Sequence, residues 1–146
     1  MAPSESVNRV TRAEWRELGF HYDFDDATQT WTLRGARAGL LGFAERLRQY
    51  AGDPRRAGLS EHDHYGPYMY LEVATWSKRE INDQWIAGSL EDLRDLAHLV
   101  SVAVEHAEVG AELDIGSAYC PGADARLILV LASPGFDPAR ADAACW

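Results

Sequence analysis

Two strands followed by a helix occur twice along this chain, and no other feature constrains its fold as strongly. Apolar residues recur every three or four positions in residues 36–51 and again in residues 89–107, so each segment can form an amphipathic helix. Polar and apolar residues alternate before each helix, which predicts a pair of strands. A third pair follows the second helix, and residues 127–131 within it are apolar on both faces, as is typical of a strand inside a sheet.

The two units also align with each other at an offset of 53 residues. The match lies in the hydrophobic pattern more than in residue identity, and it suggests that one strand-strand-helix unit was duplicated. The aligned pairs are Leu33 and Ile86, Gly35 and Gly88, Leu40 and Leu93, Phe43 and Leu96, Ala44 and Ala97, and Leu47 and Val100.

This order of elements predicts one α+β domain over residues 11–146. Its six strands, arranged along the chain as ββα-ββα-ββ, would form a single, mostly antiparallel sheet with both long helices packed on one face. The expected core comprises Leu40, Phe43, Leu47, Met69, Leu71, Val73, Leu93, Leu96, Val100, Leu129 and Leu131.

The ends of several elements can also be predicted. Residues 1–10 are polar and show no periodicity, so we expect a flexible N-terminal tail there. Thr11 to Glu14 form a capping box, which predicts a short helix that begins at Thr11 and ends before Gly19. Three of the strands are expected at residues 68–76, 81–87 and 112–119.

Charge and composition narrow the class of partner. The 146 residues carry a net charge of −9, which argues against nucleic acid, because phosphate binding needs a basic surface. The same charge would steer the protein toward a basic partner. No apolar run approaches the ~20 residues of a membrane span and no secretory signal is visible, so we expect a cytoplasmic protein that does not bind membranes. Cys120 and Cys145 form neither a CxxC pair nor a zinc spacing and are expected to be reduced, while both a monomer and a dimer remain open.

A sheet with both helices on one face leaves its other face open. Along the expected strand 68–76, every second residue is apolar and suits the helix side, while the residues between them include two tyrosines, a carboxylate and an indole. Large aromatic side chains with polar tips, mixed with acids, are typical of a recognition surface, although a merely solvated face would show the same pattern. The residues expected to form a binding surface are His21, Asp23, Glu61, His62, Asp63, His64, Tyr65, Tyr68, Tyr70, Glu72 and Trp76.

Residues 61–64 (EHDH) contain the side chains best suited to metal binding or catalysis. It belongs to residues 53–66, a loop that is long for a compact domain, and long ordered loops are often functional. A His-x-His pair on an extended segment can place both imidazoles on one side, where Glu61, Asp63 or His21 could complete a zinc or iron site. The spacing is local and no second cluster of ligands follows it, so we expect no metal and no cofactor, with His62 and His64 as the weak candidates.

Three motifs together resemble a known family. They are residues 31–35 (WTLRG) before the first helix, residues 61–68 (EHDHYGPY), and residues 88–90 (GSL) before the second helix. This order is similar to that in a family of small uncharacterised bacterial proteins, some of which resemble predicted immunity proteins encoded beside polymorphic toxins. The resemblance spans residues 14–140 and implies tight, non-catalytic capture of a toxin domain. An acidic protein with an aromatic-rich face is physically suited to blocking a basic nuclease.

We therefore expect a protein-binding module, of the immunity type, that captures a basic toxin domain with the open sheet face and the 53–66 loop. No nucleophile motif or phosphate-binding glycine loop is present, so no catalytic residue is expected. The alternative is a small enzyme, or a ligand-binding or metal-binding domain, with a pocket around residues 61–64 and the sheet. A protein-binding module needs a flat or gently concave patch that buries about 800 Å² per partner, whereas an enzyme needs a closed pocket of ~300–1,000 Å³ with converging polar groups.

Overall fold

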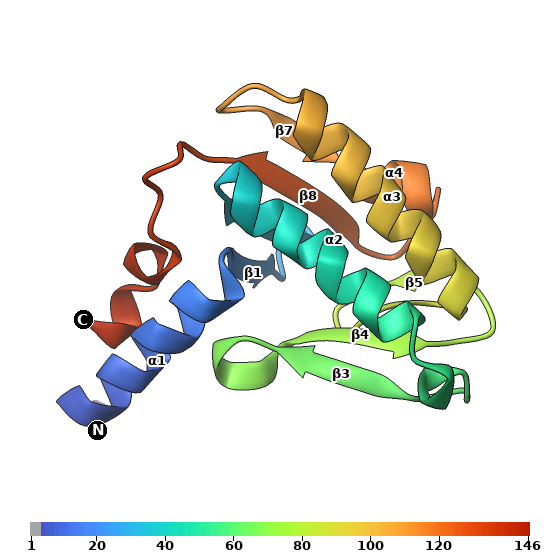
Figure 1. Ribbon diagram of the computed structural model, residues 1–146, viewed down its shortest axis with the longest axis horizontal. Helices are drawn as coiled ribbons and strands as arrows, with labels where there is room; N and C mark the ends of the chain where they lie inside the picture. The colour runs from blue at the N-terminus through green and yellow to red at the C-terminus, as the bar shows by residue number, and fades with distance from the viewer. Residues whose placement is uncertain (1–3) are drawn as a thin grey trace.

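The chain folds into two four-stranded mixed sheets, so the prediction of a single, mostly antiparallel, six-stranded sheet is wrong. The computed structural model describes residues 4–146 (Figure 1). Sheet A has the strand order β1 (His21–Asp25), β2 (Thr30–Gly35), β8 (Arg126–Leu131) and β7 (Glu112–Asp114). Sheet B has the order β3 (His62–Tyr65), β4 (Leu71–Thr75), β6 (Ile86–Gly88) and β5 (Glu80–Ile81). The predicted α+β class is confirmed.

Pairing between the two halves of the chain explains the difference. Consecutive strands form antiparallel hairpins, β1 with β2, β3 with β4, β5 with β6 and β7 with β8. The hairpins then join through parallel pairs, with β2 beside β8 and β4 beside β6. Strand periodicity determines which face of a strand is buried but not which partner lies beside it, so the sequence pattern suits two sheets as well as one.

The strand registers show the repeat that the sequence suggests. Leu33 pairs with Leu129 in sheet A, and its aligned counterpart Ile86 pairs with Val73 in sheet B. Two positions further along, Gly35 pairs with Leu131 and its aligned counterpart Gly88 pairs with Thr75. Each of these partners lies two positions beyond the partner of Leu33 or Ile86. Each half of the chain is therefore a ββαββ unit, and the two units exchange hairpins to complete both sheets.

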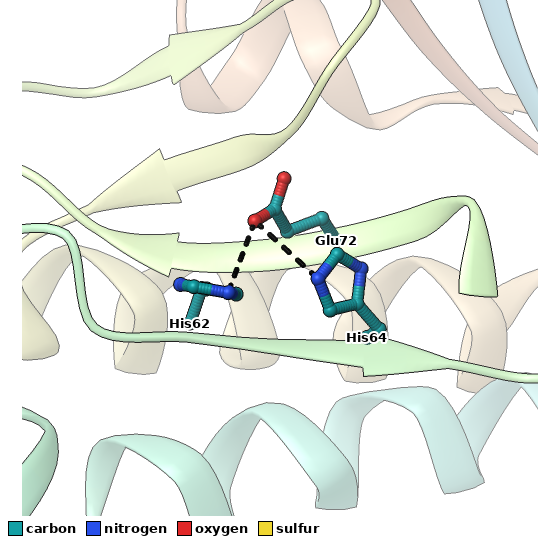
Figure 2. Close-up of side chains that lie close together, drawn as sticks. All are labelled: His62, His64 and Glu72. Atoms are coloured by element: carbon teal, nitrogen blue, oxygen red, sulfur yellow. Dashed lines mark ion pairs between the residues drawn. The ribbon is translucent and has the colours of Figure 1, made fainter.

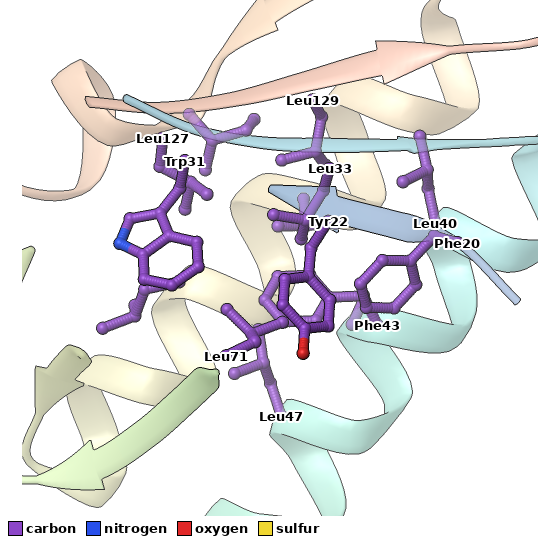
Figure 3. Close-up of a cluster of buried hydrophobic side chains, with 14 of the residues drawn as sticks. Phe20, Tyr22, Trp31, Leu33, Leu40, Phe43, Leu47, Leu71, Leu127 and Leu129 are labelled. Atoms are coloured by element: carbon purple, nitrogen blue, oxygen red, sulfur yellow. The ribbon is translucent and has the colours of Figure 1, made fainter. Parts of the chain in front are cut away.

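The two long helices pack against each other and connect the sheets. Helix α2 (Arg37–Ala51) contacts β2 and β8 of sheet A, while α3 (Leu90–His106) contacts β6 of sheet B. Both helices lie on the same side of the molecule in Figure 1. A single cluster of buried side chains includes residues of both helices and both sheets, and Figure 3 shows Trp31 and Leu33 of sheet A near Leu71 of β4 and Leu47 of α2.

All but one of the predicted core residues are buried; the exception is Met69, which is 60% exposed. The expected strand 68–76 begins only at Leu71, because η2 (Pro67–Met69) is a 3-10 turn. Tyr68 and Met69 both have positive φ angles, of 67° and 59°, which break the extended alternation. The alternation of buried and exposed residues, from which Met69 is predicted to be in the core, therefore does not extend to Met69.

The first helix begins earlier than predicted. Helix α1 starts at Glu5 and ends at Leu18, because the Ser4 hydroxyl caps it by accepting a hydrogen bond from the Val7 amide. Thr11 lies inside this helix and donates its hydroxyl to the Val7 carbonyl, so it is not the capping residue. The tail expected over residues 1–10 is thus wrong for residues 5–10, and its first three residues lie outside the described part of the chain.

The strand expected at residues 112–119 is mostly helical. Strand β7 stops at Asp114, whose side chain caps the short helix α4 (Ile115–Tyr119) by accepting from the Ser117 amide. The Tyr119 hydroxyl then donates a 2.8 Å hydrogen bond to the Ala87 carbonyl of β6, which joins α4 to sheet B. The expected strand 81–87 is likewise divided into β5 and β6 by a turn.

Helix α1 packs against two 3-10 turns near the C-terminus, η3 (Pro138–Ala141) and η4 (Ala143–Cys145). Among residues 4–146, no helix has the length and apolar character needed to cross a membrane. Both cysteines are free thiols; Cys145 is buried and Cys120 is half-buried.

Two glycines of α2 provide a matched test of this packing. A Cβ at Gly39 would overlap the carbonyl oxygen of Gly19, whereas a Cβ at Gly42 would meet nothing within 4 Å. We expect Gly39→Ala to destabilise the protein by about 1–3 kcal/mol, as overpacking does. Gly42→Ala should stabilise it by up to ~1 kcal/mol, because alanine favours the helix. Urea unfolding of both variants checks the pair, and changes of the same sign would contradict the close approach of α2 to Gly19.

Candidate functional site

A pocket of about 550 Å³ lies where the edge strand β1 of sheet A meets the segment before β4 of sheet B. Its walls carry the aromatic side chains Trp15, Tyr22, Phe24, Trp31, Tyr68 and Tyr70. They also carry the acidic side chains Asp23, Asp26, Glu72, Asp83 and Asp142, with His21 beside them. No lysine or arginine of residues 4–146 lines the pocket, so its walls combine aromatic rings with carboxyl groups.

The hydroxyl of Tyr22 fixes the turn that forms one wall. It donates a hydrogen bond to the Pro67 carbonyl and accepts one of 3.2 Å from the Tyr70 amide. Gly66, at a φ of 74°, lets the turn approach this closely, because a Cβ there would come within 2.8 Å of the Tyr22 ring. As a result Tyr68 and Tyr70 project from the turn, 47% and 68% exposed.

Asp142 links Tyr68 of this turn to Trp15 of α1 in the pocket wall. Its carboxylate accepts a 2.9 Å hydrogen bond from the Trp15 indole and one of 2.5 Å from the Tyr68 hydroxyl. Burial alone would raise the pKa of Asp142, but the hydrogen bonds from Tyr68, Trp15 and the Ala144 amide, together with His21 nearby, outweigh burial and hold the pKa below its usual range. Burial and the hydrogen bond to Asp142 together raise the pKa of Tyr68, so this phenol remains a donor.

His21 lies over the indole of Trp15, with ring centroids 4.6 Å apart and planes inclined by 35°. Burial lowers the pKa of His21, and the charges of Asp23 and Asp142 offset that shift only in part. A lowered pKa favours the neutral imidazole at neutral pH. His21 therefore contributes an aromatic surface to the pocket rather than a positive charge.

A second cluster adjoins the pocket and shares Glu72 with it. His62 and His64 project from the same face of β3, and Glu72 lies directly opposite His64 on β4 (Figure 2). The Nε2 atoms of His62 and His64 lie 3.7 and 3.8 Å from the same oxygen, Oε1 of Glu72. Ligand atoms of all three side chains lie within 4.8 Å of one another.

Backbone carbonyls orient both imidazoles. Nδ1 of His62 lies 2.9 Å from the Ser60 carbonyl oxygen, and Nδ1 of His64 lies 2.9 Å from the Met69 carbonyl oxygen. A carbonyl oxygen can only accept, so Nδ1 carries the proton in each ring. Nε2 of each ring is then the nitrogen that lies beside the Glu72 carboxylate, and an Nδ1 held by a backbone carbonyl is typical of metal-ligating histidines.

The residues expected on one open face are divided among several environments. His21, Asp23, Tyr68, Tyr70 and Glu72 line the pocket. His62 and His64 form the adjoining cluster, on a strand where the sequence predicts a loop, because β3 occupies residues 62–65.

The other four expected residues have structural partners. The Arg56 guanidinium pairs with both Glu61 and Asp63 and holds the start of β3. Tyr65 is half-buried against the core, with Arg46 over its ring. The remaining residue, Trp76, packs on Trp85 with ring centroids 5.4 Å apart.

Several pocket residues are missed by the sequence analysis. Trp15, Trp31, Asp83 and Asp142 come from four separate segments, and no local pattern relates them. Phe20, Tyr22 and Phe24 alternate with polar residues, which is consistent with the burial of Tyr22 in β1, but the pattern does not show that the Tyr22 hydroxyl holds the turn before β4 of the other sheet. Of the aromatic side chains in the pocket, the sequence analysis identifies Tyr68 and Tyr70, which are exposed as expected of a binding surface.

Comparison with known proteins yields no family model, no curated protein and no solved structure that matches this chain. The resemblance to immunity proteins therefore stays a prediction, and function must be inferred from the geometry of the pocket and the adjoining cluster.

The burial of His21 predicts a pH dependence of stability. In the unfolded chain His21 takes up a proton near its ordinary pKa of ~6.5, whereas the folded protein does so only at lower pH. The free energy of unfolding should therefore fall as the pH drops from about 7 through this window. Urea unfolding at several pH values should show a smaller fall for His21→Gln than for the parent. Equal falls would show that His21 remains as easily protonated as in the unfolded chain.

Proposed function

We propose that this chain is a non-catalytic protein-binding module, which captures a basic segment of a partner by taking an arginine or lysine side chain into the pocket. The observation that supports this proposal is the chemistry of the walls, which combine aromatic rings with carboxyl groups and include no lysine or arginine of the described residues. Such walls complement a cationic group that carries an apolar stem.

The rings lie close enough together for one cation beside them to be within cation–π range of more than one ring. The Tyr68 and Tyr70 centroids lie 5.8 Å apart with their planes inclined by 30°, and the Trp15 ring meets Tyr68 edge-on at 6.3 Å. A cation within about 6 Å of an aromatic face gains ~0.5–2 kcal/mol, depending on how far it is desolvated. Asp23 and Asp83 supply carboxyl groups on the same pocket walls.

The surroundings of the pocket suit contact with a protein. Tyr68, Met69 and Tyr70 are consecutive and largely exposed, and exposed aromatic and methionine side chains are enriched in interface cores. The net charge of −9 would accelerate encounter with a basic partner. A basic segment would meet the exposed tyrosines first and place one cationic side chain in the pocket beside their rings.

The more specific form of this proposal is an immunity-type inhibitor of a basic toxin domain. It is supported by the acidic charge, by the aromatic patch and by the resemblance carried by residues 31–35, 61–68 and 88–90. The binding surface on this proposal is the pocket rim, and not the whole set of residues expected from strand alternation.

One observation favours a second candidate. The volume of about 550 Å³ falls within the ~300–1,000 Å³ typical of small-molecule sites. A small ligand-binding domain or enzyme would use the same walls, and its ligand would be an organic cation. A ligand without a positive charge would leave the carboxyl groups of the pocket without a counter-charge.

The cation preference can be tested with two short peptides that differ by one group. We expect N-acetyl-Gly-Arg-Gly-amide to shift the indole and amide resonances around the pocket in ¹H–¹⁵N spectra, and the matching citrulline peptide, which is neutral, to shift them far less. Tyr70→Ala should weaken binding of the arginine peptide by about fivefold, the equivalent of ~1 kcal/mol of cation–π attraction. Asp23→Asn should also weaken it, whereas Glu105→Gln, an equal charge change on the exposed side of α3, should not. Equal shifts with both peptides would exclude a cation site.

The proposal of an immunity-type inhibitor requires a toxin partner. Immunity proteins are encoded beside their toxins, so the neighbouring gene is the one to test. If that gene encodes a basic toxin-like domain, co-expression should yield a stable complex. Tyr70→Ala should then weaken the complex by at least about thirtyfold, the equivalent of ~2 kcal/mol for a buried aromatic anchor. A neighbouring toxin domain that is not bound, or a complex unaffected by Tyr70→Ala, would contradict this form while leaving the peptide result unaffected.

A further inference from the structure

We infer that His62, His64 and Glu72 form a binding site for one divalent transition-metal ion, with zinc as the best match. This is the opposite of the expectation from sequence that no metal is bound. The inference does not depend on the proposed capture of a basic partner.

The sheet itself brings the three side chains together. Side chains two residues apart on a strand lie on one face, which places His62 and His64 on the same side of β3. Glu72 pairs with His64 across the antiparallel β3–β4 ladder, where opposite Cβ atoms lie ~4.5–5.5 Å apart. The donors therefore come from paired strands rather than from a mobile loop, which reduces the entropy lost when an ion is bound.

The hydrogen bonds from the two imidazoles to backbone carbonyls leave acceptor atoms of the three side chains close together, and within residues 4–146 a cation is the partner that they lack. With Nδ1 of both rings donating to carbonyls, each neutral ring presents a lone pair at Nε2. Both lone pairs face Oε1 of Glu72, so three acceptors converge with no donor between them (Figure 2). The groups that lie within 4.0 Å of the Glu72 carboxylate as possible charge partners are these two imidazoles, and no lysine or arginine of the described residues is among them. A metal ion satisfies all three acceptors at once.

The distances favour a tetrahedral ion. Bonds of 2.0–2.1 Å at tetrahedral angles place neighbouring ligand atoms ~3.4 Å apart, whereas octahedral angles place them ~2.9 Å apart. The observed separations of 3.7 and 3.8 Å between the Nε2 atoms and Oε1 are closer to the tetrahedral value. Ligand atoms of the three side chains lie within 4.8 Å of one another, so an ion would have to draw them somewhat closer together.

Two imidazoles and one carboxylate are also the donor set of zinc sites that keep one position open. The Glu72 side chain is only 9% exposed, while those of His62 and His64 are 47% and 35% exposed. The ion would thus be held from within the protein by Glu72 and remain accessible past the two imidazoles. Its fourth ligand would be water or a donor group of a bound molecule.

Metal titration of the purified chain tests this inference. After treatment with a chelator and its removal, calorimetric titration with zinc chloride should show one ion bound per chain. Cobalt(II) added to the stripped protein should give the visible absorption of a tetrahedral complex. His62→Ala and His64→Ala should each weaken zinc binding by at least about tenfold, since even outer-shell partners of ligands contribute tenfold or more. Glu72→Gln should have a similar effect.

The matched control is the double variant His98→Ala/His106→Ala, which removes two exposed histidines of α3, outside the cluster. It should bind zinc as the parent does. His62 and His64 are exposed, so their alanine variants should stay folded, and circular dichroism checks this for every variant. Absence of zinc binding up to about 1 mM, or binding that persists when His62 and His64 are both replaced, would overturn the inference.

Discussion

The parallel pairing of β2 with β8 and of β4 with β6 is the constraint on which the rest of the structure depends. Without it, the chain would form two separate ββαββ units, each with two unpaired inner strands. With it, each sheet takes one hairpin from either half, and α2 and α3 must pack together to cover both. The same pairing makes β1 an edge of sheet A beside the segment that leads into β4, which is where the pocket forms.

The contact between Tyr22 and the η2 turn shapes both the pocket and the neighbouring histidine cluster. Residues with positive φ that are not glycine cost of order 1–3 kcal/mol each, and Tyr68 and Met69 are two of them in succession. The Tyr22 hydroxyl, through its bonds to Pro67 and Tyr70, holds the turn in that conformation. The Met69 carbonyl of this turn also orients His64. One buried phenol therefore influences both the aromatic walls of the pocket and the position of a candidate metal ligand.

What the sequence predicts correctly is local. The helical periods of α2 and α3 depend on residues three and four apart, so their ranges and their core faces are visible in the sequence. The partner of β2 lies at the far end of the chain and leaves no local trace. The same holds for the site: His62 and His64 are recognisable as a pair, but Glu72 joins them only through the β3–β4 register. Asp142 and Trp15 reach the pocket through tertiary packing, which no spacing along the chain encodes.

The exchange of hairpins also has a consequence for synthesis on the ribosome. Thr30 of β2 pairs with Arg126 of β8, a partner 96 positions further along the chain. The inner edge of β2, with its free amides and carbonyls, cannot be paired until β8 has left the exit tunnel. Folding dominated by such distant contacts is slow, because a long loop must close before the pairing contributes stability. The nascent chain therefore carries an exposed strand edge from the time β2 emerges until β8 follows it, and an early stop before β8 would leave that edge permanently open to pairing with other chains.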